Sequence, residues 1–463
     1  MQMQSKSLGG TNKMSENQDL FENLPVPKAL ATLAIPTIIS QLITMIYNLS
    51  DTYFIGKTNN PYQIAAASLA YVLVFVMTAL SNLFGVGGGS LISRLLGRQK
   101  TEEAKRVCAF SFYGAIVISF IYSLGCYVFM DPLLRLLGAS DSTIGFSASY
   151  AFWVVAVGGI PSTLSMTMAQ LLRSEGYAKK ASFGLGMGGI LNIVLDPVFM
   201  FVILPSGQEV TGAGMATMLS NVISLCYFLL VFFRLRKNTV LSLSSHRLPA
   251  GMKYTAPVLS VGFPSALSSL LACVSNMTAN NLASGYGDIP VAAMGLVKKI
   301  NMLPMNVGMG LCQGMLPLVA YNYAAKNYKR MKSVINCARI SGMGFAVLCI
   351  IAFELFSGSI VSLFIKESET LALSSVFLRI SSLATPFMIS NFQMTYTLQA
   401  MGKGPQSLLL SSCRQGIIYI PLMFLMNVLF QLYGVVWAQF IADGLTLVIS
   451  FIVYRQICRQ FSE

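Results

Sequence analysis

The chain contains the same pattern twice, one copy in each half. The segment around Pro36 and Asn48 returns around Pro264 and Asn276, and each proline precedes its asparagine by twelve residues. The offset between the copies falls from 228 residues here to 222 further along, as expected if loops between matched elements had shortened. Other matched segments are IAAASL (64–69) with VAAMGL (291–296), LLRSEG (171–176) with TLQAMG (397–402), and GAGMA (212–216) with GVVWA (434–438). A duplicated unit of about 220 residues therefore sets the architecture.

Each copy is too apolar for a soluble domain. Apolar residues make up 55% of the chain and charged residues 10%, whereas a soluble domain carries about 25% charged residues. Uncharged stretches such as Val107–Met130 and Gln415–Ala442 exceed the roughly 20 residues that a helix needs to cross a bilayer. The short alternating segments of a membrane barrel are absent from the sequence, and every backbone group must be paired inside the bilayer. We therefore predict an all-α polytopic membrane protein.

Hydropathy predicts six membrane spans in each half. They cover residues 29–55, 62–92, 105–129, 146–172, 180–204 and 211–235, then 252–283, 289–320, 334–357, 374–400, 406–430 and 434–457. Because six is even, both halves enter from the same side, which predicts two six-helix lobes related by a pseudo-two-fold axis along the membrane normal. The predicted divisions are a polar tail (1–24), an N-lobe (25–236), an inter-lobe loop (237–250) and a C-lobe (251–463).

The basic residues indicate the orientation of these spans. The net charge is +14, and most Lys and Arg residues fall on the cytoplasmic side if the N-terminus lies inside. We therefore predict a multi-pass membrane protein with both termini cytoplasmic. This distribution argues against nucleic-acid binding. The stretch from Met14 (MSENQDLFENLPVPKAL) is consistent with an alternative start, a hypothesis that N-terminal sequencing of the native protein would test.

Few residues in the chain suit catalysis or metal binding. The single histidine, His246, lies in a basic loop, and the nine cysteines include no CxxC pair. No nucleophile–base pair is evident. We therefore expect no enzymatic activity and no cofactor beyond a coupling ion.

Four acidic residues fall inside the predicted spans: Asp51, Asp196, Glu354 and Asp443. A carboxylate at the centre of the bilayer costs about 2.5–3.5 kcal/mol, so such residues are functional candidates. We expect structural roles for two of them. Glu354 is expected near the outer interface, and Asp443 is expected to pair with a basic residue of its own bundle.

Asp196 is the strongest candidate for function. Asn192 precedes it by one helical turn and lies on the same face. Asp51 and Thr217 lie at a similar depth on other spans. These oxygen donors suit a hard cation such as Na+, and a buried carboxyl pair suits a proton. The alternative is that the four side chains only form hydrogen bonds that hold the helices together.

Other polar and helix-breaking residues lie within the spans. Lys298 and Lys299, about ten residues into the eighth span, either line a cavity or form structural pairs. Asn48 and Gln313 are further candidates for cavity lining. Prolines inside the first, fourth and fifth spans predict kinks or hinges, with static kinks set by packing as the alternative. They are Pro36, Pro161, Pro197, Pro264, Pro386 and Pro421.

Several segments resemble the multidrug and toxic compound extrusion (MATE) family. They are IPTIISQLITMIYNLSDTYFIG (35–56), NIVLDP (192–197), GAGMAT (212–217) and LPLVAYNYAAKNYKRM (316–331), and the likeness spans residues 25 to 460. The chain is more similar to the DinF-like and MepA-like bacterial members than to the NorM-like ones, because the span-one aspartate and the NxxxDP run are both present.

The resemblance implies a V of two six-helix lobes around a central cavity that opens to one side at a time. It also implies export of cationic or amphipathic drugs in exchange for H+ or Na+. Carried over by motif, Pro36 is the bend in the first helix, and the ion site consists of Asp51, Asn192, Asp196 and Thr217.

The second copy of the repeat lacks these carboxylates. The acidic residues that NorM-like members use in the second half have no clear match here. Asp51 aligns with Ala279, Asp196 with Ile420 and Thr217 with Gln439. The scaffold is therefore predicted to be symmetric and the ion chemistry asymmetric.

We therefore predict a secondary active multidrug efflux antiporter that works as a monomer in the lipid bilayer. The alternative is a lipid-linked oligosaccharide flippase, or another lipid flippase, of the same superfamily. Such flippases often have fourteen spans and a more cationic cavity, so twelve spans and a carboxylate-centred site argue against this alternative.

Overall fold

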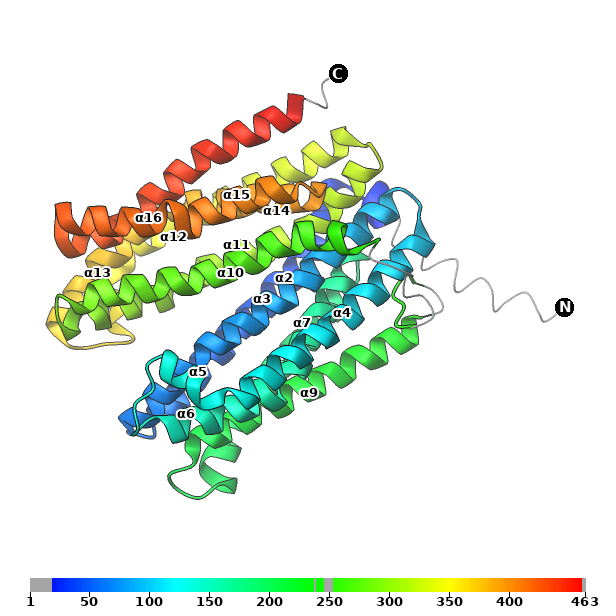
Figure 1. The fold of residues 1–463 in the computed structure, drawn as a ribbon. Coiled ribbons are helices and arrows are strands. Elements are labelled where there is room, and N and C mark those ends of the chain that lie inside the picture. Colours follow the sequence, from blue (N-terminus) through cyan, green and yellow to red (C-terminus); the bar gives the residue numbers. More distant parts are fainter. Residues whose placement is uncertain (1–18, 237–238, 245–252, 460–463) are drawn as a thin grey trace.

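The computed structural model describes residues 19–236, 239–244 and 253–459. Met14, His246, most of the polar tail and most of the inter-lobe loop lie outside the described residues. In the described part of the chain every regular element is a helix, and the helices form two groups that diverge from one end of the molecule (Figure 1).

The first group forms the N-lobe. Its elements are α2 (Val26–Gly56), α3 (Pro61–Gly97), α4 (Thr101–Val128), α5 (Met130–Leu136), α6 (Ile144–Ala151), the π-helical turn η1 (Phe152–Val157), α7 (Gly159–Ser174), α8 (Ala178–Val198), the π-helical turn η2 (Phe199–Ile203) and α9 (Glu209–Leu235).

The second group forms the C-lobe. Its elements are α10 (Thr255–Ser284), α11 (Asp288–Ala324), α12 (Tyr328–Ser362), α13 (Ser368–Ser382), α14 (Thr385–Met401), α15 (Gly404–Ser412), the π-helical turn η4 (Cys413–Ile417) and α16 (Tyr419–Arg459).

These helices account for the twelve predicted spans. In the described residues nine helical segments are long and apolar enough to cross a membrane, and two bent pairs qualify as single spans. The last of the nine, Gly404–Ile457, has 54 residues. One straight helix of that length would measure about 80 Å, far more than the roughly 30 Å hydrocarbon core. This segment therefore supplies two spans, which completes the twelve.

The chain reverses direction inside that last segment at Gln431. This residue has a φ of 52°, a left-handed value that interrupts α16. Just beyond it, a Cβ added to Gly434 would lie 1.9 Å from the carbonyl oxygen of Met426. Two backbone stretches eight residues apart can only be this close in a tight turn, so α16 contains a helical hairpin.

The predicted proline kinks are confirmed in the fourth span of each lobe. The chain bends by 48° between η1 and α7, just before Pro161, and by 45° between α13 and α14, just before Pro386. By contrast, α2 stays helical from Val26 to Gly56 although it contains Pro36. A hinge at Pro36 therefore remains a prediction.

The two lobes are in backbone contact where α3 crosses α10. A Cβ on Gly87 would lie 2.3 Å from the carbonyl oxygen of Val258, and one on Gly262 would lie 1.8 Å from that of Leu83. Only glycine fits at both positions. Helix α2 begins at the end of the molecule where the lobes meet (Figure 1), which we call the closed end.

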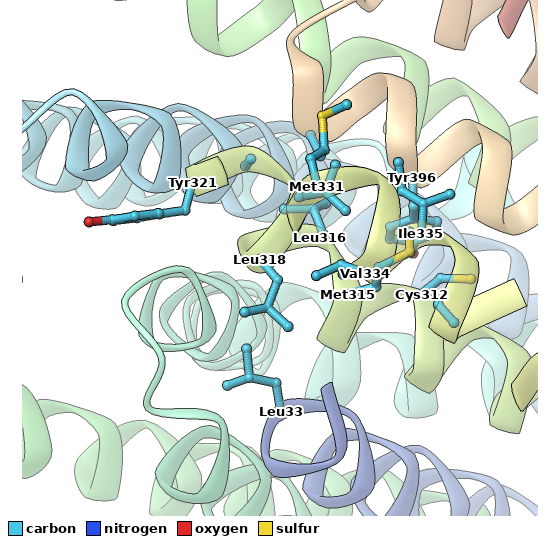
Figure 2. Packing of buried hydrophobic residues seen from close by; sticks show 14 of the residues in the cluster. Leu33, Cys312, Met315, Leu316, Leu318, Tyr321, Met331, Val334, Ile335 and Tyr396 are labelled. Carbon is cyan, nitrogen blue, oxygen red and sulfur yellow. The ribbon is translucent and has the colours of Figure 1, made fainter. Parts of the chain in front are cut away.

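A single hydrophobic cluster extends across both lobes at the closed end (Figure 2). Leu33 of α2 comes from the N-lobe, while Leu318 and Met331 come from α11 and α12 of the C-lobe. All three side chains are almost completely buried. Since each buried side chain of this size contributes about 1.5–3 kcal/mol, closure of this end is stabilised mainly by apolar burial.

The segment before α2 adds polar contacts between the lobes. Arg330 of α12 donates to the carbonyl oxygens of Phe21 (2.7 Å) and Leu24 (2.6 Å). The Phe21 ring stacks on Tyr321 of α11 at a centroid distance of 4.8 Å. The residues that lead into the N-lobe are therefore bound to the C-lobe.

The glycine contact at the lobe junction is testable by adding one methyl group. In Gly262→Ala the new Cβ would overlap backbone of α3, so the lobes must separate, and overpacking of this kind costs about 1–3 kcal/mol. We expect a lower thermal unfolding midpoint for the purified protein. The matched control is Gly344→Ala in α12, where nothing lies within 4 Å of the added Cβ. Equal midpoints for the two variants would contradict a tight α3–α10 contact.

Candidate functional site

Three of the four predicted ion-site side chains come together between α8 and α9. The Asn192 amide donates to Asp196 Oδ1 at 3.2 Å and to Thr217 Oγ1 at 3.1 Å. Asn192 and Asp196 meet because residues four apart lie on one helix face. Asp196 is completely buried and Asn192 is 2% exposed. Thr217 is half-buried and lies in the third turn of α9.

The fourth residue, Asp51, approaches this group from α2, which packs against α8. Its Oδ2 accepts a hydrogen bond from the Tyr150 hydroxyl of α6 at 3.4 Å. Because α2 packs against α8, the two carboxylates would repel each other if both were ionised. In the described residues no hydrogen bond joins Asp51 to the other three. Asp51 therefore faces the other three side chains from a different helix, α2.

Three buried acceptor oxygens of this site have no hydrogen-bond donor among the described residues. They are Asp51 Oδ1, Asn192 Oδ1 and Asp196 Oδ2. A buried acceptor without a partner costs about 1–3 kcal/mol, and more if it is charged. Carboxylate and amide oxygens are the donors that a hard cation uses. The donor set therefore fits a small cation such as Na+, or a proton on one carboxylate.

The local sequence of α8 makes the close packing around this site possible. A Cβ on Gly189 would lie 2.9 Å from Ile43 of α2, and one on Gly188 would lie 2.1 Å from Ser224 of α9. Small residues let neighbouring helices approach closely in membranes. After Asp196 and Pro197 the helix continues as the π-helical turn η2, an irregularity that often occurs at functional sites.

The C-lobe candidates Lys298 and Lys299 do not join this group. Lys298 donates to Asn280 Oδ1 at 2.7 Å and to the Asn276 carbonyl at 3.4 Å, and so links α11 to α10 within the C-lobe. Lys299 is exposed. Asn48 is half-buried on α2, one helical turn before Thr52, whose hydroxyl donates to the Asn48 carbonyl at 2.9 Å.

Gln313 lies at the junction of the lobes. Its Oε1 accepts a hydrogen bond at 3.3 Å from Arg173 of α7, which also donates to Ser40 of α2 at 3.4 Å. Arg173 and Gln313 line a small cavity of about 10 Å³, which is near the lower limit for one water molecule. Arg173 lies in the repeated segment LLRSEG, but nothing local in the sequence indicates its partner 140 residues away.

The predicted pairing of Asp443 with a basic residue of its own bundle is confirmed. Arg414 Nε lies 2.8 Å from Asp443 Oδ1, and the side chains are 8% and 1% exposed. Gln439 Nε2 donates to Asp443 Oδ2 at 2.8 Å. Glu354 is half-buried in α12. The contact of Tyr150 with Asp51 could not be predicted, because a single tyrosine in an apolar run carries no motif.

One known protein family matches a segment in each half of the chain. The family described as "MatE" matches residues 36–198 and again residues 264–425. The two matches begin at Pro36 and Pro264, the prolines that open the internal repeat, and together they cover more than half of the chain. This chain belongs to the MATE family.

Individual relatives match over almost the full length. "Multidrug export protein MepA" of Staphylococcus aureus is 32% identical over 435 residues, which cover 94% of this chain and 95% of the relative. The protein of the same name from Staphylococcus saprophyticus is 30% identical over the same shares. The crystal structure of "MATE in complex with MaD3S" has a TM-score of 0.89 at 23% identity, over 96% of this chain and 98% of that one. At this identity the structure shows that the fold is shared.

If the buried oxygens of Asp51, Asn192 and Asp196 bind an ion, protein stability should depend on that ion. A ligand that binds only the folded state raises stability by RT ln(1 + [L]/Kd). We expect Na+, or protons as the pH is lowered, to raise the unfolding midpoint of the wild-type protein. Asp196→Asn should lose that response while folding normally, because it removes the buried negative charge. Asp288→Asn, at an exposed carboxylate, is the control. An undiminished ion response in Asp196→Asn would exclude Asp196 from the site.

Proposed function

We propose that this protein is a secondary active multidrug efflux antiporter that exports cationic and amphipathic drugs in exchange for H+ or Na+. The observation that carries the proposal is the group of buried acceptor oxygens from Asp51, Asn192 and Asp196 without donors among the described residues. Membership of the MATE family and the name of the MepA relatives support it. On this proposal the protein is a transporter and needs no cofactor beyond its coupling ion.

In the proposed mechanism α2 carries the effect of ion binding to the lobe junction. Within the N-lobe α2 packs on α8, which carries Asp196, and across the junction it packs on α11. A cation or proton bound between Asp51 and Asp196 would remove their mutual repulsion. That change favours closer packing of α2 on α8, and α2 cannot shift without changing its contact with α11.

Pro36 is well placed to convert this shift into a movement of the lobes. On both sides of Pro36 the backbone of α2 packs directly against glycines of α11. A Cβ on Gly314 would lie 2.5 Å from the Cα of Ala34, and one on Gly310 would lie 2.7 Å from the Cα of Ile38. Because Pro36 lacks a backbone N–H, α2 has a missing internal hydrogen bond at this level. A bend here would separate α2 from α11 and open the closed end.

The electrochemical gradient of the coupling ion supplies enough energy for coupled export. One charge that crosses 100 mV releases about 2.3 kcal/mol, which corresponds to roughly a fiftyfold concentration ratio of drug. We further propose that the protein lies in the bacterial inner membrane with both termini cytoplasmic. The closed end then faces the cytoplasm, and the conformation described here is outward-facing. We also propose that the chain divides into an N-lobe (25–236), an inter-lobe loop (237–250) and a C-lobe (251–463).

Dye efflux from proteoliposomes tests the function and identifies the ion. We expect ethidium transport to be driven by either an imposed pH gradient or an imposed Na+ gradient, each applied alone. Asp196→Asn should reduce coupled transport to the rate of empty vesicles, because the site can no longer exchange its ion. Asp288→Asn should transport at the wild-type rate. Wild-type transport in Asp196→Asn, or no gradient-driven transport of any cationic dye by the wild-type protein, would refute the proposal.

A further inference from the structure

The C-lobe contains a polar cluster with the same chemistry as the proposed N-lobe ion site. In each lobe a buried aspartate follows an amide residue by four positions, and that amide donates to the carboxylate. The pairs are Asn192 with Asp196 (3.2 Å) and Gln439 with Asp443 (2.8 Å). Asn391 of α14 also donates to the backbone carbonyl of Asp443 at 2.8 Å.

The two clusters occupy corresponding helices of the repeat. The N-lobe site lies between α8 and α9, the fifth and sixth spans. Arg414 and Asp443 lie on the eleventh and twelfth spans, which are formed by α15, η4 and α16. Gln439 is the repeat partner of Thr217, which belongs to the N-lobe site. A carboxylate cluster therefore lies in the equivalent helix pair of each lobe, although Asp196 and Asp443 are not repeat partners.

The clusters differ in how the negative charge is balanced. In the C-lobe both carboxylate oxygens are satisfied, Oδ1 of Asp443 by Arg414 Nε and Oδ2 by Gln439. The Arg414 guanidinium also lies 4.3 Å from the ring centroid of Phe392. In the N-lobe one oxygen each of Asp51 and Asp196 has no donor among the described residues. The C-lobe balances its carboxylate with its own cation, Arg414. The N-lobe carboxylates would need a cation or proton from solution.

We propose that Arg414 is a built-in cation that occupies a latent ion site of the C-lobe and so restricts ion coupling to the N-lobe. The inference rests on the proposed function of the N-lobe site. A guanidinium does not lose its proton in proteins, and its bond to Asp443 is held in place by the chain. Neither H+ nor Na+ can therefore exchange at Asp443, although the carboxylate, Gln439 and Asn391 provide the oxygen types of a cation site.

Removing the positive charge of Arg414 should therefore create a second ion site. The test counts the ions, Na+ plus H+, that bind to each purified full-length protein in lipid nanodiscs. 22Na+ binding gives the first number, and proton uptake on acidification, measured relative to Asp51→Asn/Asp196→Asn, gives the second. We expect one ion for the wild-type protein, two for Arg414→Met and one for the charge-preserving control Arg414→Lys. Besides Arg414, Tyr419 is a titratable side chain near Asp443, so each variant is also measured with Tyr419→Phe.

The double variant Arg414→Met/Asp443→Asn keeps the inference testable if Arg414→Met does not fold. Replacing both members of a buried ion pair is usually tolerated, whereas removing one leaves an unpaired buried charge. We expect the double variant to bind one ion and to transport dye as the wild-type protein does. Size-exclusion chromatography and circular dichroism establish that each variant is folded.

The possible failures of the two proposals are distinguishable. A folded Arg414→Met protein that binds only one ion would overturn the inference. So would a wild-type protein that binds two ions and loses one in Asp443→Asn, or a folded double variant that binds none. Loss of all ion binding in Asp196→Asn together with the expected Arg414 results supports both proposals. A wild-type protein that binds no ion overturns both.

Discussion

The rest of the structure depends on the backbone contact between the lobes at the closed end. Lobes can form such a contact only where side chains are absent, and Gly87 and Gly262 meet this condition on α3 and α10. The shared apolar cluster and the residues before α2 then add burial and hydrogen bonds around it. Because α2 belongs to both this junction and the N-lobe site, any change in the packing of α2 affects both.

The second organising principle is how each buried charge is balanced. Asp443 receives its counter-charge from Arg414 within its own lobe, and Arg173 at the junction donates to the uncharged side chains of Gln313 and Ser40. Asp51 and Asp196 each keep one carboxylate oxygen without a hydrogen-bond donor among the described residues. Burying an unbalanced carboxylate is costly, so a bound cation or proton would stabilise the N-lobe site.

Much of the architecture could be predicted from the sequence because the signals are local. Span lengths follow from uncharged stretches, and the bends before Pro161 and Pro386 follow from a missing N–H. The contact of Asn192 with Asp196 follows from helical spacing. Thr217 was placed beside them by family resemblance and depth, and it does contact Asn192. The contact of Tyr150 with Asp51 spans 99 residues and has no local signal.

By itself the sequence determined that this chain crosses the membrane twelve times in two similar halves, and which spans carry buried carboxylates. It could do so because helices in a bilayer satisfy their backbone internally, so each span is encoded by its own residues. Only the tertiary structure decided which carboxylates keep oxygens without donors. Arg414 reaches Asp443 from another span, whereas no basic side chain among the described residues forms an ion pair with Asp196 or Asp51. That difference is set by packing between distant segments, and it makes a symmetric scaffold chemically asymmetric.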